Sequence, residues 1–285
     1  MANLKEIRNR IASIKSTMQI TSAMKMVSAA KLKKAQSAIV HMRPYANKLT
    51  ELLQNLSANA EDIESPYIVN REIKQVLLVS ITSNRGLCGG FNANIVKETI
   101  QEAKTNFADK KVDLVTIGKR GHDILAKHFN VIANYNDVFD QLTFAYVNTI
   151  AKKLMQLFVD GNYDKIEIIY NQFKNAATQI IKVEPFLPIE SIDNKKDSNN
   201  NYIFEPNEKI IVTELIPKSL KLQLYKAIRD SFASEHGARM TAMHKATDNA
   251  TELRDELLLS YNKARQAAIT NEILEIVAGA EALNN

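Results

Sequence analysis

The stretch "ITSAMKMVSAAKLKKAQ", residues 20–36, lies in an amphipathic helix whose apolar seam is interrupted. Alternate steps of three and four residues from Leu4 follow that seam along the first part of the chain. The apolar positions reached are Leu4, Ile7, Ile11, Ile14, Met18, Leu32, Ala35, Ile39, Met42, Ala46, Leu49, Leu53 and Leu56. A sustained 3.5-residue period is typical of a coiled-coil strand, because it keeps one seam turned toward a partner helix.

Three other positions interrupt the seam, namely Thr21, Lys25 and Ser28. One interpretation is a polar layer, which sets the register of two paired helices at some cost in stability. Pro44 is expected to kink the same helix or to break it locally, because proline removes a backbone donor.

The composition is that of an ordinary soluble protein of one or two domains, with 285 residues, 45% hydrophobic and 24% charged. Only 8 glycines, 6 prolines and no tryptophan favour helix over a loop-rich sandwich. The start, MANLKEIRNR, carries charges where a signal peptide needs its apolar stretch, and no apolar run is long enough to span a membrane. The single cysteine, Cys88, excludes an internal disulfide and fits a reducing cytoplasm.

Positive charge is concentrated at the start of the chain. The net charge is +5, yet residues 1–50 hold ten Lys or Arg against one acid, Glu6, which is a local net of +9. Such a basic helix is either a solvated face or a surface for nucleic acid, an anionic membrane or an acidic protein partner. Nucleic acid is disfavoured, because no aromatic residues are interleaved and no known binding motif is present.

The sequence predicts an N-terminal coiled-coil helix (1–58), a central α/β domain (72–207) and a C-terminal coiled-coil helix (208–285). In the central part, "QVLLVSITS" (75–83) and "VDLVTIG" (112–118) are typical of buried parallel strands. Residues 164–173 and 178–189 predict two more strands, and residues 140–160 predict a helix that Gly161 ends. The alternation predicts a small Rossmann-like sheet flanked by helices, and residues 193–202 predict an exposed polar loop.

The last long helix is expected to start near Pro217, which suits the first turn of a helix. Its expected seam is Leu220, Leu224, Ile228, Phe232, Met243, Ala246, Ala250, Leu253, Leu257, Ala264, Ala267 and Leu274. Two long helices separated by a compact domain return antiparallel, so the sequence predicts an antiparallel coiled coil of the two ends.

The stretch "SNRGLCGGFN" (83–92) follows a strand and precedes a helix, the position of phosphate-binding loops. It lacks the Gly-Lys-Ser/Thr ending of a P-loop, and its glycines do not fit GxGxxG. A tight strand-to-helix turn is therefore the favoured interpretation over an anion site. Cys88 in this stretch is a candidate nucleophile, but a structural thiol is favoured, because no histidine lies near it in the sequence.

No residue pattern predicts catalysis. The five histidines show no metal-ligand spacing, and no paired carboxylates or Ser/His/Asp set stands out. We therefore expect no catalytic, cofactor-binding or metal-ligating residues, and a mechanical or scaffolding role follows by elimination.

The two ends together resemble the gamma subunit of the rotary ATP synthases. The family's N-terminal pattern appears as "IRNRIASIKSTMQITSAMKMVSAAKLKKAQ", and its C-terminal pattern as "ATDNATELRDELLLSYNKARQAAITNEILEIVAGAEAL". The turn "SNRGLCGGFN" is a third family hallmark. The resemblance covers nearly the full length, in order.

The resemblance implies a non-catalytic rotor shaft inside a ring of three alpha and three beta subunits, with ATP chemistry on the beta subunits. It implies further partners, namely epsilon and the membrane c-ring, which provides the only membrane association. Because no transit peptide precedes MANLKEIRNR, a bacterial protein at the cytoplasmic face of the plasma membrane is expected. The resemblance also offers a second interpretation of the polar gap, whose residues then suit passing subunit surfaces.

The resemblance further implies the residues that contact the alpha/beta ring. Met24 and Lys25 match the stretch opposite acidic loops of the beta subunits. From the opposite helix the implied contacts are Arg265, Gln266, Thr270, Ile273, Ile276 and Val277. Ala264, Ala267 and Ala268 are expected to turn into the seam, and the apolar end of the helix suits an apolar sleeve. The alternative is a free coiled-coil adaptor whose α/β domain binds a nucleotide or an anionic ligand.

Overall fold

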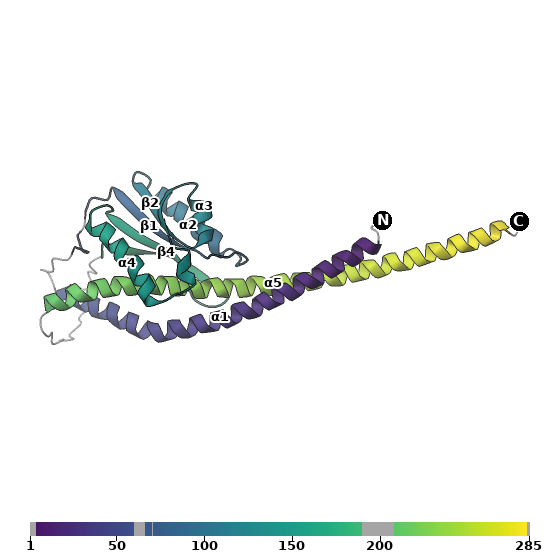
Figure 1. The fold of residues 1–285 in the computed structure, drawn as a ribbon, viewed down its shortest axis with the longest axis horizontal. Helices are drawn as coiled ribbons and strands as arrows, with labels where there is room; N and C mark the ends of the chain where they lie inside the picture. The colour runs from purple at the N-terminus through teal and green to yellow at the C-terminus, as the bar shows by residue number, and fades with distance from the viewer. Residues whose placement is uncertain (1–3, 60–65, 70, 190–207, 284–285) are drawn as a thin grey trace. The chain divides into compact units, whose positions relative to one another are not determined.

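The computed structural model describes residues 4–59, 66–69, 71–189 and 208–283. In chain order the elements are α1 (Leu4–Asn59), β1 (Gln75–Ile81), α2 (Phe91–Thr105), β2 (Lys111–Ile117), α3 (Lys119–Leu125), β3 (Asn130–Asn134), a 3-10 helix (Asp137–Phe139), α4 (Phe144–Val159), β4 (Lys165–Phe173), β5 (Gln179–Leu187) and α5 (Glu208–Leu283). Long terminal helices with a central sheet confirm the predicted fold class (Figure 1). The expected loop at 193–202 lies outside the described residues.

The chain forms two compact units. One consists of residues 28–239 and the other of residues 1–27 with 240–285, so α1 and α5 each contribute to both. Among the described residues, no helix is long and apolar enough to cross a membrane.

The predicted seam of α1 is confirmed. Every seam position from Leu4 to Met42 whose side chain is described, and Leu49 beyond it, is buried or half-buried. The side chains of Leu53 and Leu56 lie outside the described residues. Of the two alternatives expected at Pro44, the local break is wrong, because α1 continues through this residue. Met42 and Leu49, on either side of the proline, pack against Leu222 of α5, and this packing holds the helix together across the missing hydrogen bond.

The sheet has the strand order β3-β2-β1-β4-β5. β1 pairs in parallel with β2 and β4, and β2 pairs in parallel with β3, whereas β5 is antiparallel to β4. The parallel strands predicted at 75–83 and 112–118 are therefore confirmed. β3 was not predicted from the sequence, because asparagines occupy both of its ends and it is an edge strand of only five residues.

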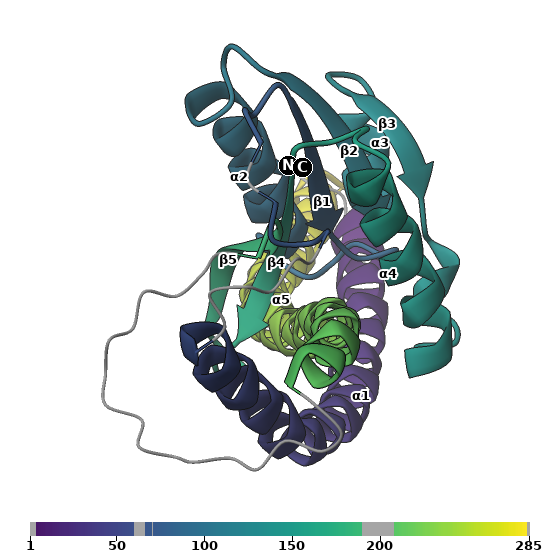
Figure 2. The ribbon, with the colours of Figure 1, turned by 90° about the vertical axis from the view of Figure 1, so that its left-hand side faces the viewer.

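Helices cover both faces of the sheet (Figure 2). One face packs against α4 and α5 through side chains such as Leu77, Phe158 and Leu224. The other packs against α2 and α3 through side chains that include Val76 and Ile95. Successive residues of β1 thus enter opposite cores, as expected of a central parallel strand. Burial of one such large side chain contributes about 1.5–3 kcal/mol.

Two helix starts differ from the sequence prediction. α4 begins at Phe144 and not at residue 140, because the Thr143 hydroxyl accepts a hydrogen bond from the Tyr146 amide and caps the helix. α5 begins at Glu208, so Pro217 lies inside the helix and not in its first turn. Ile216 and Leu220, which flank this proline, are buried in the core, and their packing compensates for the lost backbone hydrogen bond.

Candidate partner-contact surface

Within the unit formed by residues 1–27 and 240–285, α1 and α5 are paired antiparallel. Arg8 donates to the Tyr261 hydroxyl at 2.8 Å, with its guanidinium carbon 5.7 Å from the ring centroid. Further along, the hydroxyls of Thr21 and Thr247 lie 2.7 Å apart. Residue numbers decrease along α5 as they increase along α1, so the two helices are antiparallel. These two contacts also fix the register of the pair.

The polar gap in the α1 seam faces α5 at Thr21. This side chain is buried, and its hydroxyl also lies within hydrogen-bond distance of the Met18 carbonyl, as the Thr247 hydroxyl does of the Met243 carbonyl. Each hydroxyl has one proton, so one of the two threonines donates to the other, and the second donates to the carbonyl of its own helix. Two hydroxyls meet in only one register, so this site behaves as a register-setting polar layer. Ser28 is also buried, in the unit of residues 28–239.

Lys25 is half-buried beside polar groups of α5. Its ammonium nitrogen lies 3.4 Å from Nδ1 of His244, which in turn lies 3.2 Å from a carboxylate oxygen of Asp248. Met24, the other residue expected to contact a partner from α1, is half-buried on the same turn. Lys25 therefore contacts α5 through the imidazole of His244.

Beyond Tyr261, α5 has no partner helix within the described residues. The register set by Arg8 and Tyr261 brings α5 to the start of α1 a few residues later. Of the three alanines expected to turn into a tight seam, Ala264 is half-buried, but Ala267 and Ala268 are exposed, so the prediction is wrong for these two. Leu274, another predicted seam position, is also exposed, because no described helix lies opposite it. Leu253 is exposed because it falls between the inward-facing positions of the helix.

Arg265, Gln266 and Thr270 lie on this unpaired part of α5, and all three are exposed. Gln266 and Thr270 are one i, i+4 step apart, so their side chains share a face. The Thr270 hydroxyl donates to the Gln266 carbonyl at 3.0 Å, which fixes its rotamer. The pair therefore presents one amide and one restrained hydroxyl to whatever lies beside the helix.

Apolar side chains are exposed along the rest of this segment. Exposed large side chains here are Ile269, Ile273, Leu274, Ile276 and Val277. Contiguous exposed apolar surface on a soluble chain is typical of an interaction site.

The sequence prediction missed a second group of exposed apolar residues, which lies on the paired part of the helices. These are Ile20, Met26 and Val27 on α1 and Leu258 and Leu259 on α5. The signal that would have found them is their position off the 3.5-residue seam, because an apolar residue there has no partner within the pair.

The turn 83–92 joins β1 to α2 as predicted. Its surroundings argue against a nucleotide site. In an open parallel sheet, ligands enter the crevice at the carboxyl ends of strands where the strand order reverses, which here lies between β1 and β4. α5 occupies this edge, because Arg239 donates to the carbonyls of Arg85 and Gly86 and Ser234 donates to that of Asn171.

Cys88 is buried in this turn, within 3.3 Å of the Asn92 side-chain nitrogen and 3.9 Å of the Ser83 hydroxyl. Burial raises the pKa of its thiol, which disfavours the reactive thiolate. The structural interpretation of Cys88 fits these surroundings. No three potential metal ligands gather anywhere in the described ranges of the chain.

Two terminal helices that pair antiparallel, a helix-flanked sheet between them in the sequence and an exposed apolar segment on one helix define a class of coiled-coil subunits that act within a larger assembly. The family model described as ATP synthase matches residues 3–283. The chain belongs to the family of ATP synthase gamma chains.

Its relatives and structural neighbours agree with this assignment. It is 66% identical over the full length of both chains to the ATP synthase gamma chain of Flavobacterium johnsoniae, and 68% identical over 99% of both to that of Flavobacterium psychrophilum. A chain of the Tetrahymena thermophila mitochondrial ATP synthase central stalk and c-ring is 27% identical, with a TM-score of 0.61 over 80% of this chain and 99% of that one. A chain of the Euglena gracilis mitochondrial ATP synthase shares the fold at 22% identity, with a TM-score of 0.74 over 98% of this chain and 94% of that one.

Proposed function

We propose that the chain is the central rotor shaft of a proton-translocating ATP synthase, which transmits torque between the membrane c-ring and the catalytic alpha/beta ring. Family membership and the likeness to a central-stalk chain support this role. The observation that carries it is the antiparallel helix pair, which continues into a part of α5 that no described helix of the chain covers and that exposes apolar side chains. Such a segment needs a surrounding protein surface, which a ring provides.

In this role the chain has no active site of its own, and ATP is made and hydrolysed on the beta subunits. The α5 segment at the carboxyl edge of the sheet supports this point, because its contacts occupy the position where a dinucleotide-binding fold takes its ligand.

The finer assignments follow from the same role. The partners are three alpha and three beta subunits, the epsilon subunit and the c-ring, and the chain is peripheral at the cytoplasmic face of a bacterial membrane, attached through the c-ring only. The contacts with the ring are Met24, Lys25, Arg265, Gln266, Thr270, Ile273, Ile276 and Val277. The functional parts remain the N-terminal helix (1–58), the central domain (72–207) and the C-terminal helix (208–285).

Co-purification tests this proposal against the free adaptor. The tagged chain, expressed with the alpha and beta subunits of the same organism, is expected to purify with an intact ring that hydrolyses ATP, while the chain alone neither binds nor hydrolyses ATP. Stoichiometric ATP binding by the isolated chain, with no ring recovered, would favour the adaptor and overturn the proposal.

A further inference from the structure

Arg239 of α5 is a buried cation that binds the turn after β1. Its Nε donates to the Gly86 carbonyl at 3.2 Å, and its Nη2 donates to the Arg85 carbonyl at 3.1 Å. Only 7% of this residue is exposed. The planar fork of a guanidinium matches two adjacent acceptors, which the single ammonium group of a lysine does not do.

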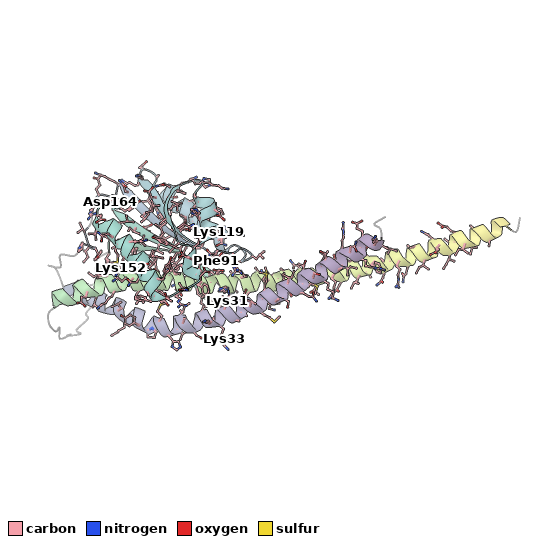
Figure 3. All side chains as sticks on the ribbon, in the orientation of Figure 1. Lys31, Lys33, Phe91, Lys119, Lys152 and Asp164 are labelled. Carbon is pink, nitrogen blue, oxygen red and sulfur yellow. The ribbon has the colours of Figure 1, made fainter. Side chains whose placement is uncertain are left out.

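The same guanidinium is held from its own helix. Nη2 lies 2.7 Å from a carboxylate oxygen of Glu235, one turn earlier, and Nη1 donates to Nδ1 of His236 at 3.3 Å. Burial raises the pKa of Glu235, and the adjacent positive charge of Arg239, with that of Lys31 on α1, opposes this shift. Lys31 is labelled in Figure 3. A buried ion pair with every guanidinium nitrogen bonded restrains its neighbours strongly, because breaking it leaves a buried charge unpaired.

The turn that Arg239 binds is strained. Leu87 has a φ of 61°, in the left-handed region that costs a non-glycine residue about 1–2 kcal/mol. Its apolar side chain is 63% exposed, so burial does not compensate for this backbone conformation. A strained residue persists only where its surroundings determine its conformation. Here the two bonds from Arg239 to the preceding carbonyls restrain the turn, together with the Ser83 hydroxyl, which donates to the Arg85 carbonyl at 2.7 Å.

Other contacts fix the same part of α5 to the sheet. The Ser234 hydroxyl donates to the Asn171 carbonyl at 3.0 Å, and the Asn171 side chain donates to the carbonyl of Phe91, labelled in Figure 3 at the start of α2. A Cβ at Gly237 would lie 3.1 Å from the Ala176 carbonyl oxygen, so α5 passes close to the turn between β4 and β5. One turn and a half of helix therefore contacts three separate parts of the α/β domain.

We propose that Arg239, held by Glu235, is a positioning residue that fixes the turn 85–87 to α5, so that the α/β domain and this helix rotate as one rigid body with Leu87 held in a fixed direction. The proposal rests on the rotor function, because a shaft transmits torque only if the domain that receives it does not slip against the helix that carries it. The helix pair, the ring contacts and family membership do not by themselves assign this role to any residue.

The buried Cys88 provides a direct measure of the turn, since it is the only cysteine of the chain. In Arg239→Lys the charge and the ion pair with Glu235 are retained, but one ammonium group replaces the two bonds to the turn. The rate of Cys88 modification by a thiol reagent in the full-length chain is expected to rise by about tenfold or more, as for the loss of a charged hydrogen bond. Lys218→Gln is the matched control, because Lys218 forms an exposed i, i+4 ion pair on the same helix, and it should leave the rate unchanged.

The second readout is coupling in the reconstituted complex. The Arg239→Lys complex is expected to hydrolyse ATP but to pump fewer protons per ATP than the wild type, whereas the control pumps normally. Glu235→Gln, which retains both bonds to the turn, is the second variant if Arg239→Lys does not accumulate, and it should change both readouts in the same direction but by less. An unchanged Cys88 rate, or a raised rate with unchanged pumping per ATP, overturns the proposal. Failure of the wild-type complex to pump would instead overturn the rotor function.

Discussion

At the residue scale, the buried His236 shows how the interior of the protein changes the pKa of a side chain. Burial first, and then the positive charges of Arg239 and Lys31, lower its pKa to about 3. The ring packs edge-on against Phe232, with centroids 4.5 Å apart, and its Nδ1 accepts from Arg239. This hydrogen bond requires a neutral ring that carries its proton on Nε2.

The lowered pKa of His236 predicts acid sensitivity. As pH falls below about 6.5, the unfolded chain binds a proton on this histidine and the folded chain does not, so stability is lost by up to about 1.4 kcal/mol per pH unit until pH reaches about 3. Glu235 acts in the opposite direction, because its raised pKa lets the folded chain bind a proton first. Urea unfolding of the wild type and His236→Gln between pH 7.5 and 5 separates the two effects. The free energy of unfolding of the variant should fall less on acidification than that of the wild type. Equal decreases would contradict the lowered pKa of His236.

At the element scale, the pairing of α1 with α5 depends on a polar contact within an apolar seam. One of the two threonine hydroxyls, Thr21 or Thr247, donates to the other between the helices, and the accepting hydroxyl donates to a carbonyl of its own helix. A polar layer of this kind weakens the seam but opposes a shift of register, since a shift separates the two hydroxyls.

A double-mutant cycle tests this contact. Thr21→Val or Thr247→Val alone should destabilise the full-length chain by about 1 kcal/mol, because each leaves the other hydroxyl facing a methyl group. The double substitution should cost less than both single changes together, by about 0.5 kcal/mol or more. Thr251→Val, whose hydroxyl bonds only to the Thr247 carbonyl, is the control outside the contact. Additive effects of Thr21 and Thr247 in urea unfolding would show that the two hydroxyls do not act as a pair.

The exposed face of α5 makes a second prediction at this scale. Gln266→Ala with Thr270→Ala is expected to lower coupled ATP synthesis by the complex while the subunit stays fully helical, because both side chains are exposed and alanine is the better helix former. Asn262→Ala, also exposed, is the control. Synthesis rate and complex yield are measured on the same membranes. If the double variant assembles and synthesises ATP like the wild type, these two residues are not torque contacts.

Met24 tests the α1 side of the same surface. Met24→Lys places a second positive charge next to Lys25, and we expect it to add an attraction to acidic partner loops at only some rotor angles. ATP-driven proton pumping relative to hydrolysis should therefore fall in the reconstituted complex. Met24→Leu keeps the volume without the charge and should leave the ratio unchanged. A normal ratio in Met24→Lys would remove Met24 from the set of ring contacts.

At the scale of the whole molecule, the sequence predicted the features that local periodicity encodes. The 3.5-residue seam predicted α1, and β-branched apolar runs predicted β1 and β2. β3 was not predicted, because its sequence, NVIAN, is short and polar at both ends. The exposure of Ala267 depends on where α1 begins opposite α5, which is decided by the register and not by the residues nearby. The contact of Arg239 with the turn at Gly86 joins parts of the chain that are distant in sequence, and no local sequence pattern predicts it.

Rotation of this chain against the ring is the most direct test of the rotor function. A single reactive cysteine, placed by Lys110→Cys in a Cys88→Ser background, lies at an exposed position of the α/β domain and carries the probe. With the alpha/beta ring immobilised, ATP is expected to drive rotation of the probe in one direction, and the rotation should stop when ATP is removed. A probe that stays fixed relative to the ring, while the same complexes hydrolyse ATP, would contradict the rotor function.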